Sequence, residues 1–227
     1  MAETTCPSCG AELRFRSSVS VYTVCASCGS MVVRFGAAVE AIGKMAALPE
    51  DISPIQIGTT LVHAGRTHTV IGRYIMAWAD GRWTEWFIDD GTAQGWLAHA
   101  QGFFAVAFDS PLQPDLAARA WPALDDEVAI DGTTYSVADL LEATCIGAEG
   151  ELPFPAVPGR VIHYADMLGP GAEFASLELA DDKRTLFVGT YAAFDDLNFA
   201  GLRPLEGWKV PAPSQARRLD PQFPPAR

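Results

Sequence analysis

The chain has 227 residues, of which 49 % are hydrophobic and 19 % charged, so its composition is that of a folded protein rather than a disordered segment. The net charge of −12 argues against nucleic acid as a partner, because phosphate contacts need clustered lysine and arginine. The same charge disfavours adsorption to an anionic membrane, and no apolar run approaches the roughly 18 residues of a membrane span. The start MAETTC lacks the features of a secretory signal, so we expect a cytoplasmic protein with no direct membrane insertion.

Four of the five cysteines stand near the start of the chain, in the stretches CPSCG and CASCG. Their spacing, C-x2-C-x15-C-x2-C, is typical of zinc ribbons, and the glycine after each pair lets the backbone turn back toward the thiolates. A segment of about 35 residues cannot bury enough core to fold alone, so a metal is expected to hold residues 1–36 together. A redox-active pair and an iron–sulfur cluster are the alternatives. We predict one structural Zn²⁺ ion bound by Cys6, Cys9, Cys25 and Cys28.

Residues 37–54 are predicted to link the ribbon to the rest of the chain through a short amphipathic helix. Val39, Ile42 and Met45 recur at near-helical spacing before Pro49. We expect this linker to join two units with separate cores, so that loss of the metal would unfold the ribbon and leave the following domain largely intact.

From residue 55 to about 203 the sequence is typical of antiparallel β structure, with short apolar runs separated by Gly, Asp-Gly and Pro. The stretch TLVHAGRTHTV (60–70) matches EVAIDGTTYSV (127–137), and this match aligns Gly65 with Gly132. Two looser matches pair WADGRWTEW with GAEGELPF, and EWFIDDGTAQGWL with LELADDKRTLFVG. The predicted fold is therefore all-β, with an N-terminal zinc ribbon followed by a duplicated antiparallel β domain of two barrel- or sandwich-like units.

The two halves of the duplicated domain are expected at about 55–110 and 125–203, each with about four strands. Within the second half, SVADLLEA (136–143) also shows helical spacing behind Ser136 as an N-cap, but the duplication favours a strand there. The segment 204–227 is rich in proline and arginine and is predicted to be a mobile tail.

The ribbon is followed by AALPEDISPIQIGT, HTVIGRY, GRWTEWFIDDGTAQGWLAHAQG and, in the second half, AEGELPF. With these stretches the chain from Cys6 to Leu202 resembles a bacterial family known as domain of unknown function 4178. The resemblance implies operon neighbours that include small membrane proteins, phage-shock-type proteins and polyamine-synthesis enzymes, and it implies no established enzyme activity. The chain departs from the family pattern at Thr84, where asparagine is commoner, so the resemblance assigns no role to that side chain.

The central signature concentrates aromatic and acidic side chains within fourteen residues. Alternation along a strand places Trp83, Glu85 and Phe87 on one face. One interpretation is structural, with tryptophans in the sheet core and Asp90-Gly91 as a hairpin turn. The functional interpretation is a shallow groove that holds a cationic group or a basic peptide, with at least one tryptophan partly exposed beside a carboxylate. The candidate groove residues are Trp83, Glu85, Trp86, Asp90 and Trp96.

We expect no enzymatic activity from this sequence. Asp89 and Asp90 point to opposite faces of a strand, which is unsuited to acid–base pairing, and no motif links Cys145 to His163 as nucleophile and base. The histidines are too scattered to predict a second metal site. The sequence predicts a non-enzymatic zinc-binding adaptor or assembly module that contacts another protein, with a membrane-stress or polyamine-linked operon implied by the resemblance. The alternative is a binding domain for a small cationic ligand such as a polyamine.

Overall fold

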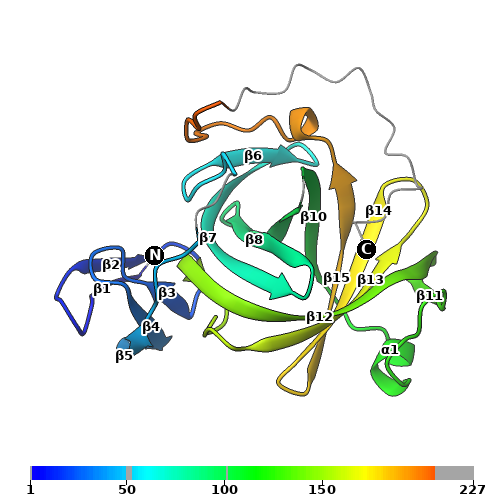
Figure 1. Cartoon of the computed structure of the whole chain (residues 1–227), viewed down its shortest axis with the longest axis horizontal. Helices are drawn as coiled ribbons and strands as arrows, with labels where there is room; N and C mark the ends of the chain where they lie inside the picture. The colour runs from blue at the N-terminus through cyan, green and yellow to red at the C-terminus, as the bar shows by residue number, and fades with distance from the viewer. Residues whose placement is uncertain (1, 50–52, 101, 208–227) are drawn as a thin grey trace.

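The computed structural model describes residues 2–49, 53–100 and 102–207, so the predicted tail from residue 208 onward lies outside the described residues. The fold is almost entirely β structure, as predicted, with one short helix and one 3-10 turn among the described residues (Figure 1). No helix in this described part of the chain is long and apolar enough to cross a membrane.

The N-terminal ribbon consists of five short strands, which are β1 (Ala2–Thr5), β2 (Glu12–Phe15), β3 (Tyr22–Val24), β4 (Ser30–Phe35) and β5 (Ala38–Lys44). β1 and β2 form a hairpin, and β3, β4 and β5 pair in sequence order. The predicted linker helix was therefore wrong, because its first half is strand β5. Gly36 explains the difference, since its φ of +63° lets the chain reverse after β4 and pair back with it. Sheet hydrogen bonds thus replace those of a short helix.

Eight strands close into one antiparallel barrel. They are β7 (Arg66–Trp78), β8 (Gly81–Asp89), β9 (Gln94–Ala100), β10 (Phe103–Ser110), β12 (Thr133–Leu152), β13 (Val161–Leu168), β14 (Glu173–Ala180) and β15 (Lys183–Ala192). Each strand pairs with its neighbour in the chain, and the pairs β10–β15 and β7–β12 close the ring. The segment 136–143 lies within β12, which confirms the strand that the duplication predicted.

The two halves of the domain share one strand order. Short strands β6 (Thr60–His63) and β11 (Glu127–Ile130) form equivalent hairpins with β7 and β12. Gly65 and Gly132 turn these hairpins with φ of +74° and +85°. Both looser matches were wrong. Glu149 and Gly150 of GAEGELPF lie inside β12. The other match pairs β8–β9 with β14–β15, whereas the shared strand order makes β13–β14 the equivalent of β8–β9.

The sequence led us to expect two separate β units, but the two halves together form one barrel. Each half contributes four strands, and a four-stranded sheet would leave two open edges. Pairing across the halves satisfies those edges, and the result is a single barrel interior.

The outer surface of each half is covered by chain segments that lie outside the barrel strands. Near β7–β10, Ile55 and Leu197 from segments outside the barrel pack with Trp86 and Leu97 in one buried cluster. Leu197 belongs to the 3-10 turn η1 (Phe194–Leu197). On the second half, helix α1 (Pro114–Ala118) and β11 cover an equivalent cluster, whose members are Leu116, Val128, Ile130, Tyr135, Val137, Ala165, Met167, Ala175, Leu177 and Leu186.

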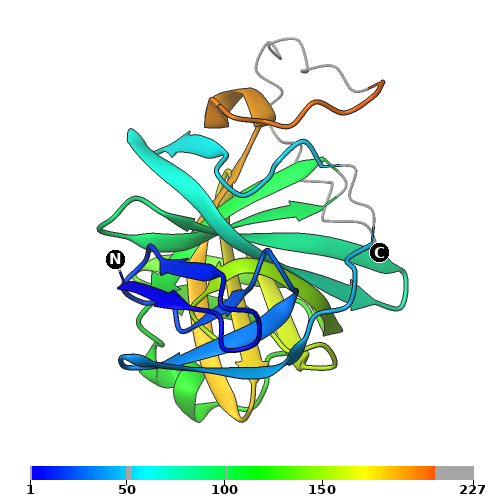
Figure 2. The same ribbon diagram turned by 90° about the vertical axis from the view of Figure 1, so that its left-hand side faces the viewer.

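The ribbon packs directly on the barrel and shares its core. In Figure 2 the blue strands of the ribbon lie against the barrel. β3 pairs with the end of β12, where Tyr22 lies opposite Leu152. Ribbon residues Tyr22, Met31 and Val33 belong to the same buried cluster as barrel residues that include Tyr74. The predicted separation into two independent cores was therefore wrong. Short ribbon strands bury too little surface by themselves, and β12 offers them a strand edge and an apolar face.

Candidate functional site

The barrel encloses a cavity of about 280 Å³. An eight-stranded barrel has an interior that ordinary side chains just fill. Here β9 and β10 line the interior with the small residues Ala98, Ala100, Ala105 and Ala107, and these leave the space open. The volume lies at the small end of the range for ligand sites, so the cavity suits a small molecule.

The cavity opens at the end of the barrel where β7 turns into β8 and β9 into β10. Two lining residues at this end are exposed, Asp80 in the first turn and Phe103 at the start of β10. The other lining residues are partly or fully buried. A ligand therefore has a path from solvent to the barrel interior at this end.

The lining is acidic and aromatic. Its five carboxyl groups belong to Asp80, Glu85, Asp139, Asp166 and Glu178. Its aromatic side chains are Trp78, Trp83, Trp96, Phe103, Tyr164, Phe174, Phe187 and Tyr191. Among the described residues that line it, none is a lysine, arginine or histidine, so the wall supplies no cation to balance these carboxyl groups.

Glu85 lies on β8 and accepts a hydrogen bond of 2.7 Å from Trp83 Nε1. The two residues are two positions apart on the strand, so alternation places both side chains inside the barrel. Burial raises the pKa of Glu85 to about 8, against the opposing effect of the Trp83 hydrogen bond. Desolvation thus dominates, and the ionised form of this carboxyl group lacks adequate compensation.

Two further acidic groups reach the cavity from the second half of the chain. Ser176 Oγ donates a hydrogen bond of 2.6 Å to Asp166, whose pKa burial raises to about 6. Burial also raises the pKa of Glu178 well above its ordinary value, with Glu85 and Asp166 adding repulsion and Arg160 partly opposing it. Three carboxyl groups on three strands therefore face one another in a space that disfavours their charges.

A tyrosine hydroxyl beside these carboxyl groups has spare hydrogen-bonding capacity. Tyr164 is 3 % exposed and lines the cavity, and its Oη lies near the Tyr74 hydroxyl but makes no hydrogen bond of good geometry within the described part of the structure. Its ring packs edge-on against Trp83, with centroids 5.3 Å apart. Buried polar groups normally have a partner, so this hydroxyl indicates room for one in the cavity.

The structure separates the five candidate groove residues. Trp83, Glu85 and Trp96 line the cavity, which replaces the surface groove that the sequence predicted. Trp86 faces the other side of β8, where it is 1 % exposed in the outer cluster. Asp90 lies in the turn after β8 and is bound by Arg66 at 2.5 Å. Strand alternation therefore gives Trp86 and Asp90 structural positions away from the cavity.

The sequence interpretation missed Tyr164, Asp166 and Glu178. A signal for them was present, because YADML and SLELA place a polar side chain on every second position of apolar strands. That pattern puts Tyr164 with Asp166, and Ser176 with Glu178, on one face of their strands. Only the closure of the barrel shows that this face is the interior.

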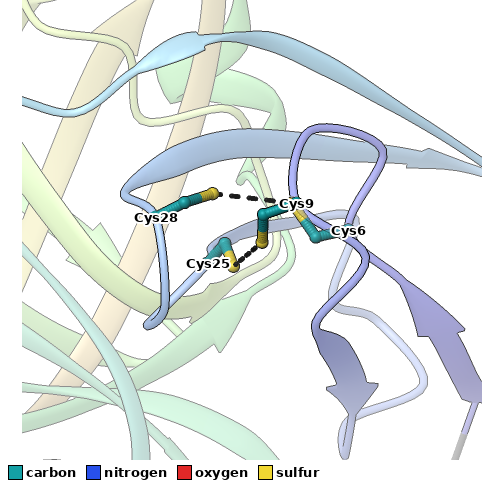
Figure 3. A group of neighbouring side chains, drawn as sticks. All are labelled: Cys6, Cys9, Cys25 and Cys28. Carbon is teal, nitrogen blue, oxygen red and sulfur yellow. Dashed lines mark hydrogen bonds between the residues drawn. The ribbon is translucent and has the colours of Figure 1, made fainter.

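The four N-terminal cysteines form a second site, within the ribbon (Figure 3). The sulfur atoms of Cys6 and Cys28, and those of Cys9 and Cys25, are each 3.8 Å apart. All four sulfur atoms lie within 4.8 Å of one another. A tetrahedral ion with metal–sulfur bonds of about 2.3 Å needs sulfur–sulfur distances of about 3.8 Å, so the cluster can hold a metal ion.

The backbone of each cysteine pair turns at a glycine. Gly10 and Gly29 have φ of +76° and +71°, and their N–H groups donate to the carbonyls of Cys6 and Cys25 at 2.9 Å and 2.8 Å. Hydrogen bonding, above all with the Ser30 hydroxyl, lowers the pKa of Cys28 to about 6, whereas the pKa of Cys9 is raised to about 12 despite a hydrogen bond from the Ala11 backbone that lowers it. A lowered thiol pKa favours the thiolate, which is the form that binds metal.

Comparisons with known proteins place the chain by family. A family model described as domain of unknown function (DUF4178) matches residues 56–193, which include all eight barrel strands up to the end of β15. No curated protein and no solved structure matches the chain.

Proposed function

The chain belongs to the family described as domain of unknown function DUF4178, and because that description assigns no activity, we propose a function from the cavity: the barrel binds a small organic cation. The observation that carries this proposal is the cavity lining, which has five carboxyl groups and no basic residue among its described members. The cation-binding alternative from the sequence is thereby favoured over the adaptor hypothesis.

A bound cation would relieve the cost of the buried carboxyl groups. Burial raises the pKa of Glu85 to about 8 and that of Asp166 to about 6, so both groups are poorly solvated when ionised. An ammonium group beside either carboxyl group would supply charge-assisted hydrogen bonds and favour its ionised form. A neutral apolar ligand would leave the carboxyl groups without this compensation.

The aromatic walls suit the rest of such a ligand. Trp78 and Trp83 pack together with ring centroids 5.2 Å apart, and Trp83 also lines the acidic part of the cavity. Indole faces attract cations and also pack against methylene groups. The ligand class is therefore a small amine with an apolar part, and a polyamine is one example.

The proposal is of binding rather than catalysis. The described lining residues offer carboxyl, hydroxyl and indole groups, and the proposal gives these groups the role of holding the ligand.

A structural Zn²⁺ ion is our proposal for the four-cysteine cluster. Four thiolates with no position left for water are typical of structural zinc sites, and the 3.8 Å sulfur distances fit a tetrahedral ion. Cys6, Cys9, Cys25 and Cys28 would hold the ion and fix the ribbon against β12.

A protein partner is the second candidate function, in line with the adaptor hypothesis. The observation that favours it is on the ribbon, where Phe35 at the end of β4 is 62 % exposed and Ile42 in the outer strand β5 is 42 % exposed. Exposed apolar side chains at a strand edge are typical of contact surfaces. Such a partner would be compatible with a ligand inside the barrel.

Isothermal titration calorimetry with spermidine tests the cation proposal. We expect saturable binding near one ligand per chain, and we expect Glu85→Gln to weaken it roughly tenfold or more, because a hydrogen bond to a charged group contributes about 1.5–3 kcal/mol. The matched control is Glu127→Gln, which removes the same charge from an exposed position on β11. Absence of saturable heat, or equal weakening by both substitutions, would contradict the proposal.

A further inference from the structure

The carboxyl groups of the cavity lie at two depths along the strands. Asp139 is directly opposite Asp166, and Asp166 is opposite Ser176, so these residues form one level. Tyr164 is opposite Glu178 and stands two positions before Asp166 on β13. Two residues of a strand span about 7 Å, so the second level lies about that far along the barrel wall.

The level that contains Asp166 is the outer one. β13 runs toward the same end of the barrel as β7, because neighbouring strands alternate in direction around the ring. That end carries the exposed opening at Asp80. Asp166 is two residues from the end of β13, whereas Tyr164 lies deeper.

Glu85 belongs to the inner level. It stands four positions after the start of β8 and lies opposite Tyr74. Burial above all raises the pKa of Tyr74, and Glu178 and Glu85 raise it further. At the outer level, burial raises the pKa of Tyr191, and Asp166 and Asp139 raise it further.

Each level therefore has a pair of carboxyl groups, and one monovalent cation can lie in only one of them. The outer pair is Asp139 and Asp166, and the inner pair is Glu85 and Glu178. A ligand with a single charge would leave the other pair repelling within the same cavity.

We propose that the ligand is a linear diamine or a longer polyamine, with one ammonium group at the inner pair and a second at the outer pair. This inference rests on the proposed function and specifies its ligand class. The Tyr164 hydroxyl, which lies near the Tyr74 hydroxyl, has an oxygen that can accept a further N–H from the inner ammonium group.

The spacing of the two levels sets the length of the ligand. An extended chain advances about 1.2 Å per bond, so the five bonds between the nitrogens of 1,4-diaminobutane span about 6 Å. That length is close to the distance of about 7 Å between the levels, and short nitrogen–oxygen contacts at each end make up the difference. The methylene groups between the nitrogens then lie against the alanine wall of Ala98 and Ala105.

Calorimetric titration with 1,4-diaminobutane and with n-butylamine tests the inference, since the two differ by one terminal amine. We expect the diamine to bind at least tenfold more tightly than the monoamine. Asp166→Asn should remove most of that advantage and change monoamine affinity by less than threefold, because the monoamine occupies the inner pair. Asn keeps the size and the Ser176 hydrogen bond of Asp166, and thermal unfolding of the variant checks that it folds.

The outcomes separate this inference from the proposed function. If the two amines bind with equal affinity, or if Asp166→Asn weakens both equally, the two-level ligand is wrong and the cation site stands. If neither amine nor spermidine binds to the unsubstituted protein, the proposed function fails and the inference fails with it. A selective loss of the diamine advantage in Asp166→Asn, with Glu127→Gln unchanged, supports the inference.

Discussion

At the scale of single residues, Glu85 on β8 and Asp90 in the turn after it have carboxyl groups in opposite environments. Asp90 accepts hydrogen bonds from Arg66 and from the backbone N–H groups of Thr92 and Ala93, and the Arg66 contact above all lowers its pKa. Glu85 has one indole N–H and no cation, and burial raises its pKa to about 8. Asp90 therefore stabilises a turn when ionised, whereas ionised Glu85 destabilises the empty barrel.

This contrast predicts how Glu85 links stability to pH. Its pKa is about 8 in the folded protein and 4.5 as the ordinary value, so the unfolded chain ionises first. The contribution of protonated Glu85 to the free energy of unfolding is fully present below pH 4.5. It is lost as the pH rises through about 8. Relative to Glu85→Gln, the unsubstituted protein should lose more than about 1.4 kcal/mol of unfolding free energy over that range, the value of one pKa unit. Urea denaturation of both proteins at several pH values measures this difference.

A bound cation should abolish most of the pH dependence of stability that Glu85 causes. At saturating spermidine the carboxylate has a partner, so the pH dependence of the unsubstituted protein should approach that of Glu85→Gln. If the two proteins show parallel pH profiles without ligand, Glu85 is already well solvated and the burial argument is wrong.

At the scale of elements, strand β12 connects the two sites. Its first part pairs with β13, its later part with β7, and its last residues with β3 of the ribbon. Glu151 near its end is buried and accepts hydrogen bonds from the backbone N–H groups of Arg16 and Ser17. The close approach of Gly72 to the Glu151 backbone leaves no room for a Cβ atom, so the seam between β7 and β12 is tightly packed. We therefore expect the contacts between the ribbon and β12 to contribute to the stability of the barrel.

Metal removal should therefore destabilise the barrel as well as the ribbon. We expect Cys9→Ser, or treatment with a strong chelator, to release one metal ion per chain and to lower the thermal midpoint followed by tryptophan fluorescence. The described ribbon contains no tryptophan, and four of the six tryptophans, Trp78, Trp83, Trp86 and Trp96, lie on barrel strands, so this signal reports parts of the chain outside the ribbon. Restoring Zn²⁺ after chelation is the control. An unchanged tryptophan midpoint after complete metal loss would show that the ribbon and the barrel are energetically separate.

At the scale of the whole molecule, the sequence predicted local features well. The cysteine spacing predicted the four-sulfur cluster, and strand alternation placed Trp83 and Glu85 on one face. The matched hairpins at Gly65 and Gly132 identified equivalent turns in the two halves. Each of these features depends on residues that are close in the chain or on one short spacing rule.

Local sequence patterns could not predict which distant strands pair with one another. Closure of the ring by β10–β15 and β7–β12 joins segments that are far apart in the chain, and it decides which face of each strand becomes the interior. Glu85 from the first half and Glu178 from the second could therefore not be assigned to one cavity. The bulge in β12 between Cys145 and Gly147 also shifts the register in a way that no alternation pattern indicates.

The most direct test of the central claim is a crystal structure of the protein grown with 1,4-diaminobutane. The account predicts the ligand inside the barrel, with one nitrogen about 2.7–2.9 Å from a carboxylate oxygen of Glu85 or Glu178. It also predicts the second nitrogen beside Asp166 and the methylene groups against the alanine wall. A ligand bound only on the outer surface, or a cavity filled by a neutral molecule in the presence of saturating diamine, would contradict the account.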